Sequence, residues 1–177
     1  TRVPIEQYSI RIEPAKHFVN WQQDPHGNFL MRLVFPEPTD HFRISVDVRA
    51  ELVAFNPFDF FLEDAVEKYP FTYPADALPA LAPYLIPSPD LGKEFEAFLK
   101  TLPPKEPLRT VDFLVGLNTK LREHVNYVVR MEPGVQSCED TLGRAIGSCR
   151  DSAWLLVQIM RHLGLAARFA SGYLVQL

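Results

Sequence analysis

The hydrophobic period changes along this chain, and the change restricts the fold to a mixed type. Up to about residue 55, apolar side chains recur at every second position, which indicates half-buried antiparallel strands. After Pro107 they recur every three to four positions, which indicates amphipathic helices. Residues 56–107 hold ten of the sixteen prolines, so we expect an ordered but irregular connector with short helical turns. The prediction is an α+β protein with a β-domain at 1–55, a Pro-rich connector at 56–107 and a third part at 108–177.

The β-domain is predicted to be a small antiparallel sandwich. Residues 24–28 and 36–40 are rich in turn formers, and we expect them to join consecutive strands as hairpins. The apolar alternation that defines the strands involves Tyr8, Ile10 and Ile12; Phe29, Met31, Leu33 and Phe35; and Ile44, Val46, Val48, Ala50 and Leu52.

Three helices and one helical turn are predicted in the rest of the chain. The first helix has Ser88 as N-cap and Pro89 at its first position, and the second is capped by Thr110. The third runs over 149–163, is apolar on nearly all sides and ends at Gly164, after which a strand is expected. A helical turn is expected at 139–142. The apolar stripes are Leu91, Phe95, Phe98 and Leu102 in the first helix, and Leu114, Leu117, Leu121 and Val125 in the second.

Charge and composition exclude several functional classes. The net charge is -4 and no basic run is present, so we expect no binding of nucleic acid or of a membrane surface. No stretch approaches the roughly 18 apolar residues of a membrane span, and the start resembles no signal peptide, so we expect a cytoplasmic location. Two cysteines are too few for a disulfide framework, which favours free thiols. No metal or other cofactor is expected. The first residue is Thr1, which indicates a processed chain or a fragment.

Cys149 is the main candidate for chemistry. A helix N-terminus carries unpaired N–H groups and a partial positive charge, which favour a thiolate at the first turn. A buried helix behind that turn would hold such a nucleophile rigidly, and backbone N–H groups would face an oxyanion. On this local physics alone, a small core cysteine is an equally good interpretation.

A longer pattern around Cys149 changes that balance. The string "GSCRDSAWLLVQIMRHLGLAARFASGYL", with "VNYV" and "EDTL" upstream, resembles the nucleophile helix and following strand of the transglutaminase-like superfamily. Residues 1–55 resemble the small β-domain that precedes the core in bacterial members. The resemblance implies a partial papain-like core with a Cys-His-Asp arrangement in which Cys149 is the nucleophile. Tyr127 is a candidate oxyanion donor or a core side chain. Arg150 and Asp151 are expected to support the site by pairing with each other or with flanking loops.

The base is not evident in the sequence. His162 lies thirteen residues along the helix from Cys149, about 20 Å away. His124 fits a helix C-terminus better than a catalytic role. The other three histidines, His17, His26 and His41, belong to the β-domain. The resemblance implies that the catalytic His and Asp follow Leu177. Cys138 is predicted to be a structural residue in a loop.

These observations predict the N-terminal portion of a transglutaminase-like cysteine enzyme that cleaves or transfers an amide acyl group of a peptide or other amide substrate. The alternative is a non-catalytic interaction module with the same fold. The chain alone is expected to be inactive. It is also expected to form homo-oligomers, through its terminal strand or through an uncovered face of the helix at 149–163 that includes Trp154, Leu155, Leu156 and Ile159.

Overall fold

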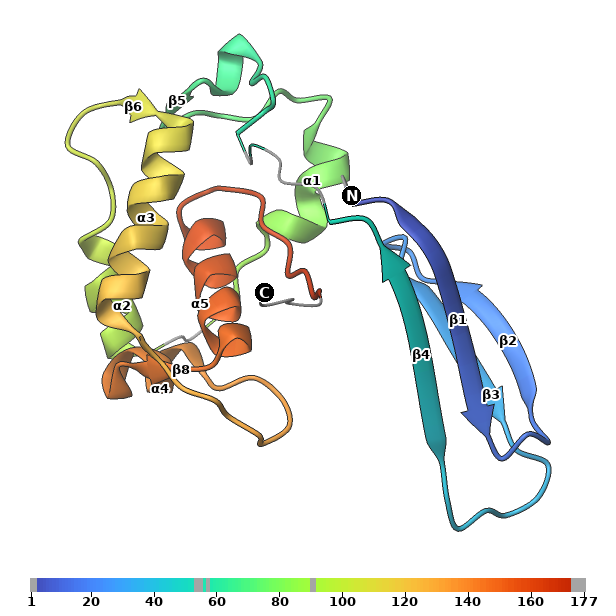
Figure 1. Ribbon diagram of the computed structural model, residues 1–177. Coiled ribbons are helices and arrows are strands. Elements are labelled where there is room, and N and C mark those ends of the chain that lie inside the picture. Colours follow the sequence, from blue (N-terminus) through green and yellow to red (C-terminus); the bar gives the residue numbers. More distant parts are fainter. Residues whose placement is uncertain (1–2, 53–55, 57, 90–91, 173–177) are drawn as a thin grey trace. The chain divides into compact units, whose positions relative to one another are not determined.

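A computed structural model describes residues 3–52, 56, 58–89 and 92–172 of the chain. The chain divides into two compact units, Thr1–Phe60 and Phe61–Leu177 (Figure 1). Across these described ranges, five helices of four or more residues and a short 3-10 helix, Asp64–Val66, belong to the second unit. Within the described residues, no helix combines the length and the apolar character needed to cross a membrane.

The first unit consists of four strands in two antiparallel pairs. Strand β1 (Ile5–Glu13) pairs with β4 (Arg43–Ala50), and β2 (Phe18–Gln23) pairs with β3 (Phe29–Val34). The expected hairpin around residues 24–28 is confirmed, and the Asp24 carboxylate stabilises it by accepting the N–H groups of His26 and Asn28. The expected hairpin around 36–40 is wrong, because β4 pairs with β1 and not with β3.

The predicted alternation in β1 and β4 agrees with their register. Tyr8, Ile10 and Ile12 lie opposite Val48, Val46 and Ile44, so the apolar residues of both strands share one face. The Phe35 ring, one residue beyond β3, contacts the rings of His17 and Phe42. The unit therefore contains two separate two-stranded sheets where the sequence predicted a sandwich.

The second unit is helical with two very short sheets. It contains α1 (Leu78–Leu85), α2 (Lys93–Lys100), α3 (Thr110–His124), α4 (Cys138–Arg144) and α5 (Cys149–His162). Strands β5 (Lys68–Tyr69) and β6 (Leu108–Arg109) are antiparallel, whereas β7 (Asn126–Tyr127) and β8 (Ile146–Gly147) are parallel. Residues 61–107 of the Pro-rich segment, with α1 and α2, thus form part of this unit.

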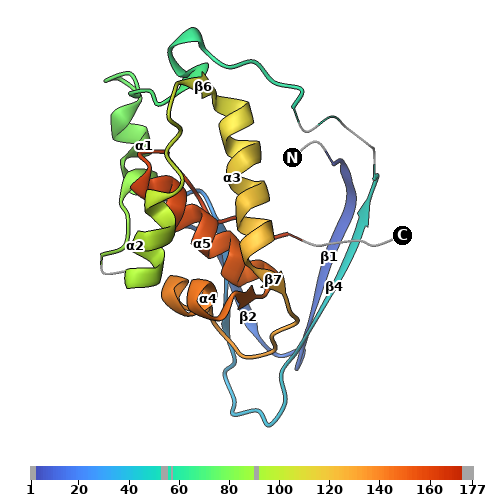
Figure 2. The ribbon, with the colours of Figure 1, turned by 90° about the vertical axis from the view of Figure 1, so that its left-hand side faces the viewer.

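Helix α5 lies at the centre of the second unit, with α2 and α3 on either side of it (Figure 2). Leu155 and Ile159 of α5 are completely buried, and the core around them includes Phe95, Leu117 and Leu142. Burial of such side chains contributes about 2 kcal/mol each. Of the four side chains expected on an uncovered face of α5, Leu155 and Ile159 are covered by this core, whereas Trp154 and Leu156 are half-buried and pack against it.

A second apolar cluster fixes the end of α5. The rings of Tyr69 and Phe113 stack with centroids 3.9 Å apart, and the Tyr69 hydroxyl donates to the Leu163 carbonyl at 3.0 Å. Gly164 has φ +77° and follows the helix as predicted, with the Leu165 N–H donating to the Met160 carbonyl. Residues 165–172 form no strand, contrary to the expectation, and the rest of the expected strand lies outside the described residues.

Two predicted helix starts differ from the structure. Helix α2 begins at Lys93, not at Pro89, because the Glu139 carboxylate accepts the N–H groups of Glu94 and Phe95 and so caps the helix from α4. Thr110 is the first residue of α3 rather than its N-cap, and its hydroxyl donates to the Val66 carbonyl. Leu91, assigned to the apolar stripe of the first helix, lies outside the described residues.

The buried face of α3 agrees with the prediction at Leu117, Leu121 and Val125 and differs at Leu114. Phe113, Leu117 and Leu121 are buried, whereas Leu114 is 37% exposed. Both Phe113 and Leu114 have a helical spacing to Leu117, and stacking of Phe113 on Tyr69 decides between them.

Candidate functional site around Cys149

Cys149 is the first residue of α5, and its side chain is exposed. It follows the short strand β8 and the N-cap residue Ser148. Gly147 is tightly enclosed here, because a Cβ at this position would lie 3.2 Å from side-chain atoms of Asp151 and Thr141. The predicted helix start is thus confirmed, with an exposed thiol ahead of a helix that is buried on its core-facing side.

Asp151 organises the beginning of α5. Its side chain is completely buried, and its carboxylate accepts the backbone N–H and the hydroxyl of Ser148, at 2.8 and 2.7 Å. It also accepts the Gln136 N–H at 2.7 Å and two N–H groups of Arg130, Nε at 2.9 Å and Nη2 at 3.0 Å. The hydrogen bonds from Arg130, together with those from Gln136 and Ser148, hold the pKa of Asp151 well below its usual range despite burial.

Two arginines attach the loop at residues 130–136 to this helix start. Arg130 donates to the Gly134 carbonyl as well as to Asp151, which fixes the curvature of the loop. Arg150 donates to the carbonyls of Arg130 and Glu132, at 3.1 and 2.6 Å. Arg150 and Asp151 therefore pair with the flanking loop and not with each other. Arg130, which has the largest role in the arrangement, was not singled out in the sequence.

Tyr127 is the last residue of β7, and its backbone lies beside Gly147, two residues before Cys149. The Val128 N–H donates to the Gly147 carbonyl at 3.0 Å and continues this attachment. The Tyr127 side chain is 68% exposed, so the interpretation as a core tyrosine is wrong. Its backbone is fixed near the nucleophile while its ring extends into solvent.

Neither histidine of the second unit adjoins Cys149. The His162 ring lies at the opposite end of α5, against the Ser88 carbonyl and the Phe95 ring. The His124 ring ends α3 between the Leu142 carbonyl and the Phe98 ring. His17 and His41 are hydrogen bonded within the first unit, to Pro14 and Asp40. Among the described residues of the second unit, Cys149 thus has no imidazole partner.

Cys138 has the opposite environment to Cys149. It is the first residue of α4 and not part of a loop, and only 2% of it is exposed. It packs in the core beside Phe95 and Leu142. Burial raises the pKa of Cys138 to about 11, so the thiol stays protonated and unreactive at neutral pH.

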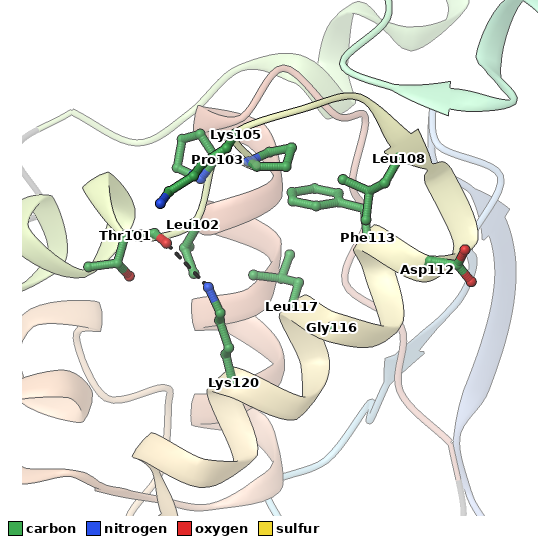
Figure 3. A pocket seen from close by; sticks show the side chains of 11 residues that line it. Thr101, Leu102, Pro103, Lys105, Leu108, Asp112, Phe113, Gly116, Leu117 and Lys120 are labelled. Carbon is green, nitrogen blue, oxygen red and sulfur yellow. Dashed lines mark hydrogen bonds between the residues drawn. The ribbon is translucent and has the colours of Figure 1, made fainter.

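A pocket of about 350 Å³ opens elsewhere in the second unit, between α3 and the segment that follows α2. Figure 3 shows Lys105 and Lys120 at its rim and Phe113 and Leu117 in its wall. None of its lining residues is a candidate catalytic residue, so this concavity is separate from the Cys149 site. The described residues include no group of three or more His, Cys, Asp or Glu side chains able to hold a metal ion.

Comparison with known proteins assigns both parts of the chain. Residues 1–51 match the family described as "Bacterial transglutaminase-like N-terminal region", and residues 100–177 match the "Transglutaminase-like superfamily". No curated protein matches the chain. A crystal structure from Cytophaga hutchinsonii, described as "a Putative Cysteine Protease", matches with a TM-score of 0.57 at 18% identity. The match covers 91% of this chain and 53% of that one, so the chain spans about half of its structural neighbour.

The two family matches follow the same order as the two parts of the chain, and the structural neighbour has the same fold. The Cys149 helix and the loop attached to it lie within the core match. The chain is an α+β protein that belongs to the transglutaminase-like superfamily, with the bacterial N-terminal region at residues 1–51 followed by the core match at residues 100–177.

Proposed function

We propose that Cys149 is the nucleophile of an acyl-transfer reaction on a peptide or other amide. The observation that carries this proposal is the exposed thiol at the N-terminus of a helix whose core-facing side is buried. The helix dipole and the unpaired N–H groups of the first turn favour negative charge there, first on sulfur and then on the oxygen of the tetrahedral intermediate. The core packing of Leu155 and Ile159 keeps the thiol in a fixed position.

In the proposed reaction, the Cys149 sulfur attacks the carbonyl carbon of the amide. A carbon–sulfur bond forms, the carbon–nitrogen bond breaks, and the amine leaves with a proton. Water then attacks the thioester, which releases a carboxylic acid and regenerates the thiol. We favour hydrolysis over transfer to a second amine, because water is always available and nothing in the chain marks an amine site.

The proton transfers require an imidazole and a group that orients it. We place these on strands after Leu177, as the family resemblance implies, and the length of the structural neighbour is consistent with such a segment. Tyr127 is a candidate donor to the oxyanion, while Arg150 and Asp151 support the helix start. Two free cysteines, one of them exposed, favour a reducing compartment such as the cytoplasm.

The test uses a longer form of the protein that includes the strands after Leu177, incubated with a library of peptide amides. We expect release of carboxylic acid products, and mass spectrometry of acid-quenched samples should find the acyl group on Cys149. Cys149→Ser should abolish turnover, whereas Cys138→Ala should retain it because Cys138 is a core residue.

The 177-residue chain provides a second control and should show no turnover. Turnover by this chain alone would show that the base lies within it and is misassigned. Absence of both turnover and acyl adduct in the longer form would favour the alternative, a non-catalytic module that has kept the fold.

A further inference from the structure

The start of α5 has an electrostatic conflict. The Asp151 carboxylate lies in the same first turn as Cys149 and accepts the Ser148 N–H, as a negative group at this position of a helix commonly does. Asp151 is completely buried, so solvent screens its charge poorly. A negative charge in the same helical turn as the thiol opposes formation of the thiolate that the proposed reaction needs.

Arg130 removes this conflict. Its guanidinium donates two hydrogen bonds to the Asp151 carboxylate, through Nε at 2.9 Å and Nη2 at 3.0 Å. Such a forked ion pair is short, directional and stronger than a pair with a single contact. The arginine side chain is itself 18% exposed, so the whole pair is largely shielded from water.

The other charged groups near the first turn of α5 contact partners other than Asp151. Arg150 binds the carbonyls of Arg130 and Glu132, and the Glu132 carboxylate lies 3.8 Å from the Arg130 guanidinium, exposed to solvent. In the adjoining α4, Glu139 caps α2 and Asp140 pairs with Arg144 at 3.7 Å. His124 at the end of α3 contacts the Leu142 carbonyl. Asp151 is thus the one completely buried charge among these groups, and Arg130 is its ionic partner.

We propose that Arg130 is a positioning residue for the Cys149 nucleophile: it neutralises the carboxylate that caps the helix and so leaves the helix N-terminus free to stabilise the thiolate. It acts through Asp151 and touches no substrate. The inference rests on the proposed function, because Arg130 has this positioning role only if Cys149 is the nucleophile.

The test measures the rate of Cys149 alkylation by iodoacetamide against pH, in the 177-residue chain, with mass spectrometry to identify the labelled residue. Arg130→Met leaves the Asp151 charge uncompensated, so the pH midpoint of alkylation should rise by roughly half a unit. Asp151→Asn leaves the Arg130 charge uncompensated, so the midpoint should fall by a similar amount. The double variant should return close to the original midpoint.

The opposite signs separate an electrostatic role from a purely structural one. Both single substitutions break the same ion pair and loosen the same loop, so a structural effect would move the two midpoints in the same direction. Arg130→Lys, which keeps the charge but loses the fork, should restore most of the original midpoint. Arg122→Met removes one exposed positive charge from α3 and serves as the matched control, with no shift expected.

Circular dichroism of each variant shows whether it folds. If Arg130→Met unfolds, the alkylation midpoints of Arg130→Lys and Asp151→Asn still test the inference, because only Asp151→Asn should shift substantially. Shifts of the same sign in the two single variants, or an unshifted midpoint in a folded Arg130→Met, would overturn the inference. Alkylation needs no amide substrate, so failure of the proposed reaction and failure of this inference are observed separately.

Discussion

The two cysteines show that burial, and not the place of a residue in its helix, decides the chemistry of a thiol. Cys149 and Cys138 each occupy the first position of a helix, α5 and α4, where the helix dipole favours negative charge. Cys149 is exposed, whereas Cys138 is 2% exposed and faces the core. Desolvation opposes the thiolate at Cys138 and exceeds the favourable effect of the helix N-terminus, since the pKa of Cys138 is raised to about 11.

We therefore expect selective alkylation of the folded chain. At about pH 8, iodoacetamide should modify Cys149 and leave Cys138 unmodified, with rates that differ by at least roughly a hundredfold, because the buried thiol is protonated and inaccessible. Denaturant should make both cysteines reactive. Cys149→Ser should eliminate labelling under native conditions, and rapid labelling of Cys138 in that variant would contradict its burial.

The ion pair at Asp151 predicts a dependence of stability on pH. The folded-state pKa of Asp151 lies below that of an unfolded aspartate, about 3.9, so its contribution is present above that pH and is lost as the pH falls further. At pH 7, Asp151→Asn should reduce the free energy of unfolding by about 3 kcal/mol, because Arg130 loses its ionic partner.

Urea unfolding followed by the helical circular dichroism signal measures this effect at about pH 7 and pH 3. The difference between the original chain and Asp151→Asn should narrow at the lower pH. An equal difference at both pH values would mean that the carboxylate contributes through packing and not through its charge.

At the scale of elements, α2 and α4 are joined by a cap that comes from a distant part of the chain. The Glu139 carboxylate accepts the N–H groups of Glu94 and Phe95 at 3.1 and 3.0 Å, and Gly92 precedes the helix with φ +92°. A Cβ on Gly92 would lie 2.2 Å from the Glu139 carboxyl carbon. Glycine is required here by both its backbone conformation and the approach of the capping side chain.

Two glycine substitutions should consequently have opposite effects. Gly92→Ala should lower the free energy of unfolding by about 2 kcal/mol, from backbone strain and displacement of the Glu139 cap. Gly116→Ala, inside α3, should raise it by about 0.5–1 kcal/mol, because its Cβ meets no atom within 4 Å and alanine favours helix. Urea titration compares the two, and a stabilising Gly92→Ala would show that the cap is absent in solution.

The elements that were predictable from sequence are those defined by local signals. Helix α5 has polar Ser148 before it, a dense apolar sequence within it and Gly164 after it, so its bounds agree with the structure within one residue. The start of α2 was misplaced because Ser88 and Pro89 provide a good local signal, while the actual cap, Glu139, lies 45 residues after Glu94. Arg130 was missed for the same reason, since 21 residues separate it from Asp151. The alternation of apolar residues likewise predicts that β1 and β4 are strands but not which strand pairs with which, so the pairing of β4 with β1 was not predictable.

At the scale of the whole molecule, the second unit has a closed core but an exposed apolar segment next to the nucleophile. Leu155 and Ile159 of α5 are completely buried and Trp154 and Leu156 are half-buried, so association through this helix stays a prediction. The loop that precedes α4 does expose apolar side chains: Tyr127 is 68% exposed, Val129 76%, Met131 87% and Val135 45%. Four exposed apolar side chains on one short segment, which Arg130 and Arg150 hold in place, favour association.

We therefore expect the 177-residue chain to self-associate at micromolar concentration through the segment at 127–135. Met131→Glu should weaken the association at least about tenfold, because a charge would have to be desolvated in the contact. Ile86→Glu is the matched control, since Ile86 is also exposed, at 64%, but lies after α1. Sedimentation velocity over a range of concentrations measures the effect. If Ile86→Glu weakens the association as much as Met131→Glu does, the segment at 127–135 is not the contact. A monodisperse monomer would show that the exposed apolar side chains of this segment are tolerated in water. If the segment at 127–135 is part of a substrate-binding wall beside Cys149, additional strands in a longer form of the protein should cover it. The longer form should then associate less than the 177-residue chain.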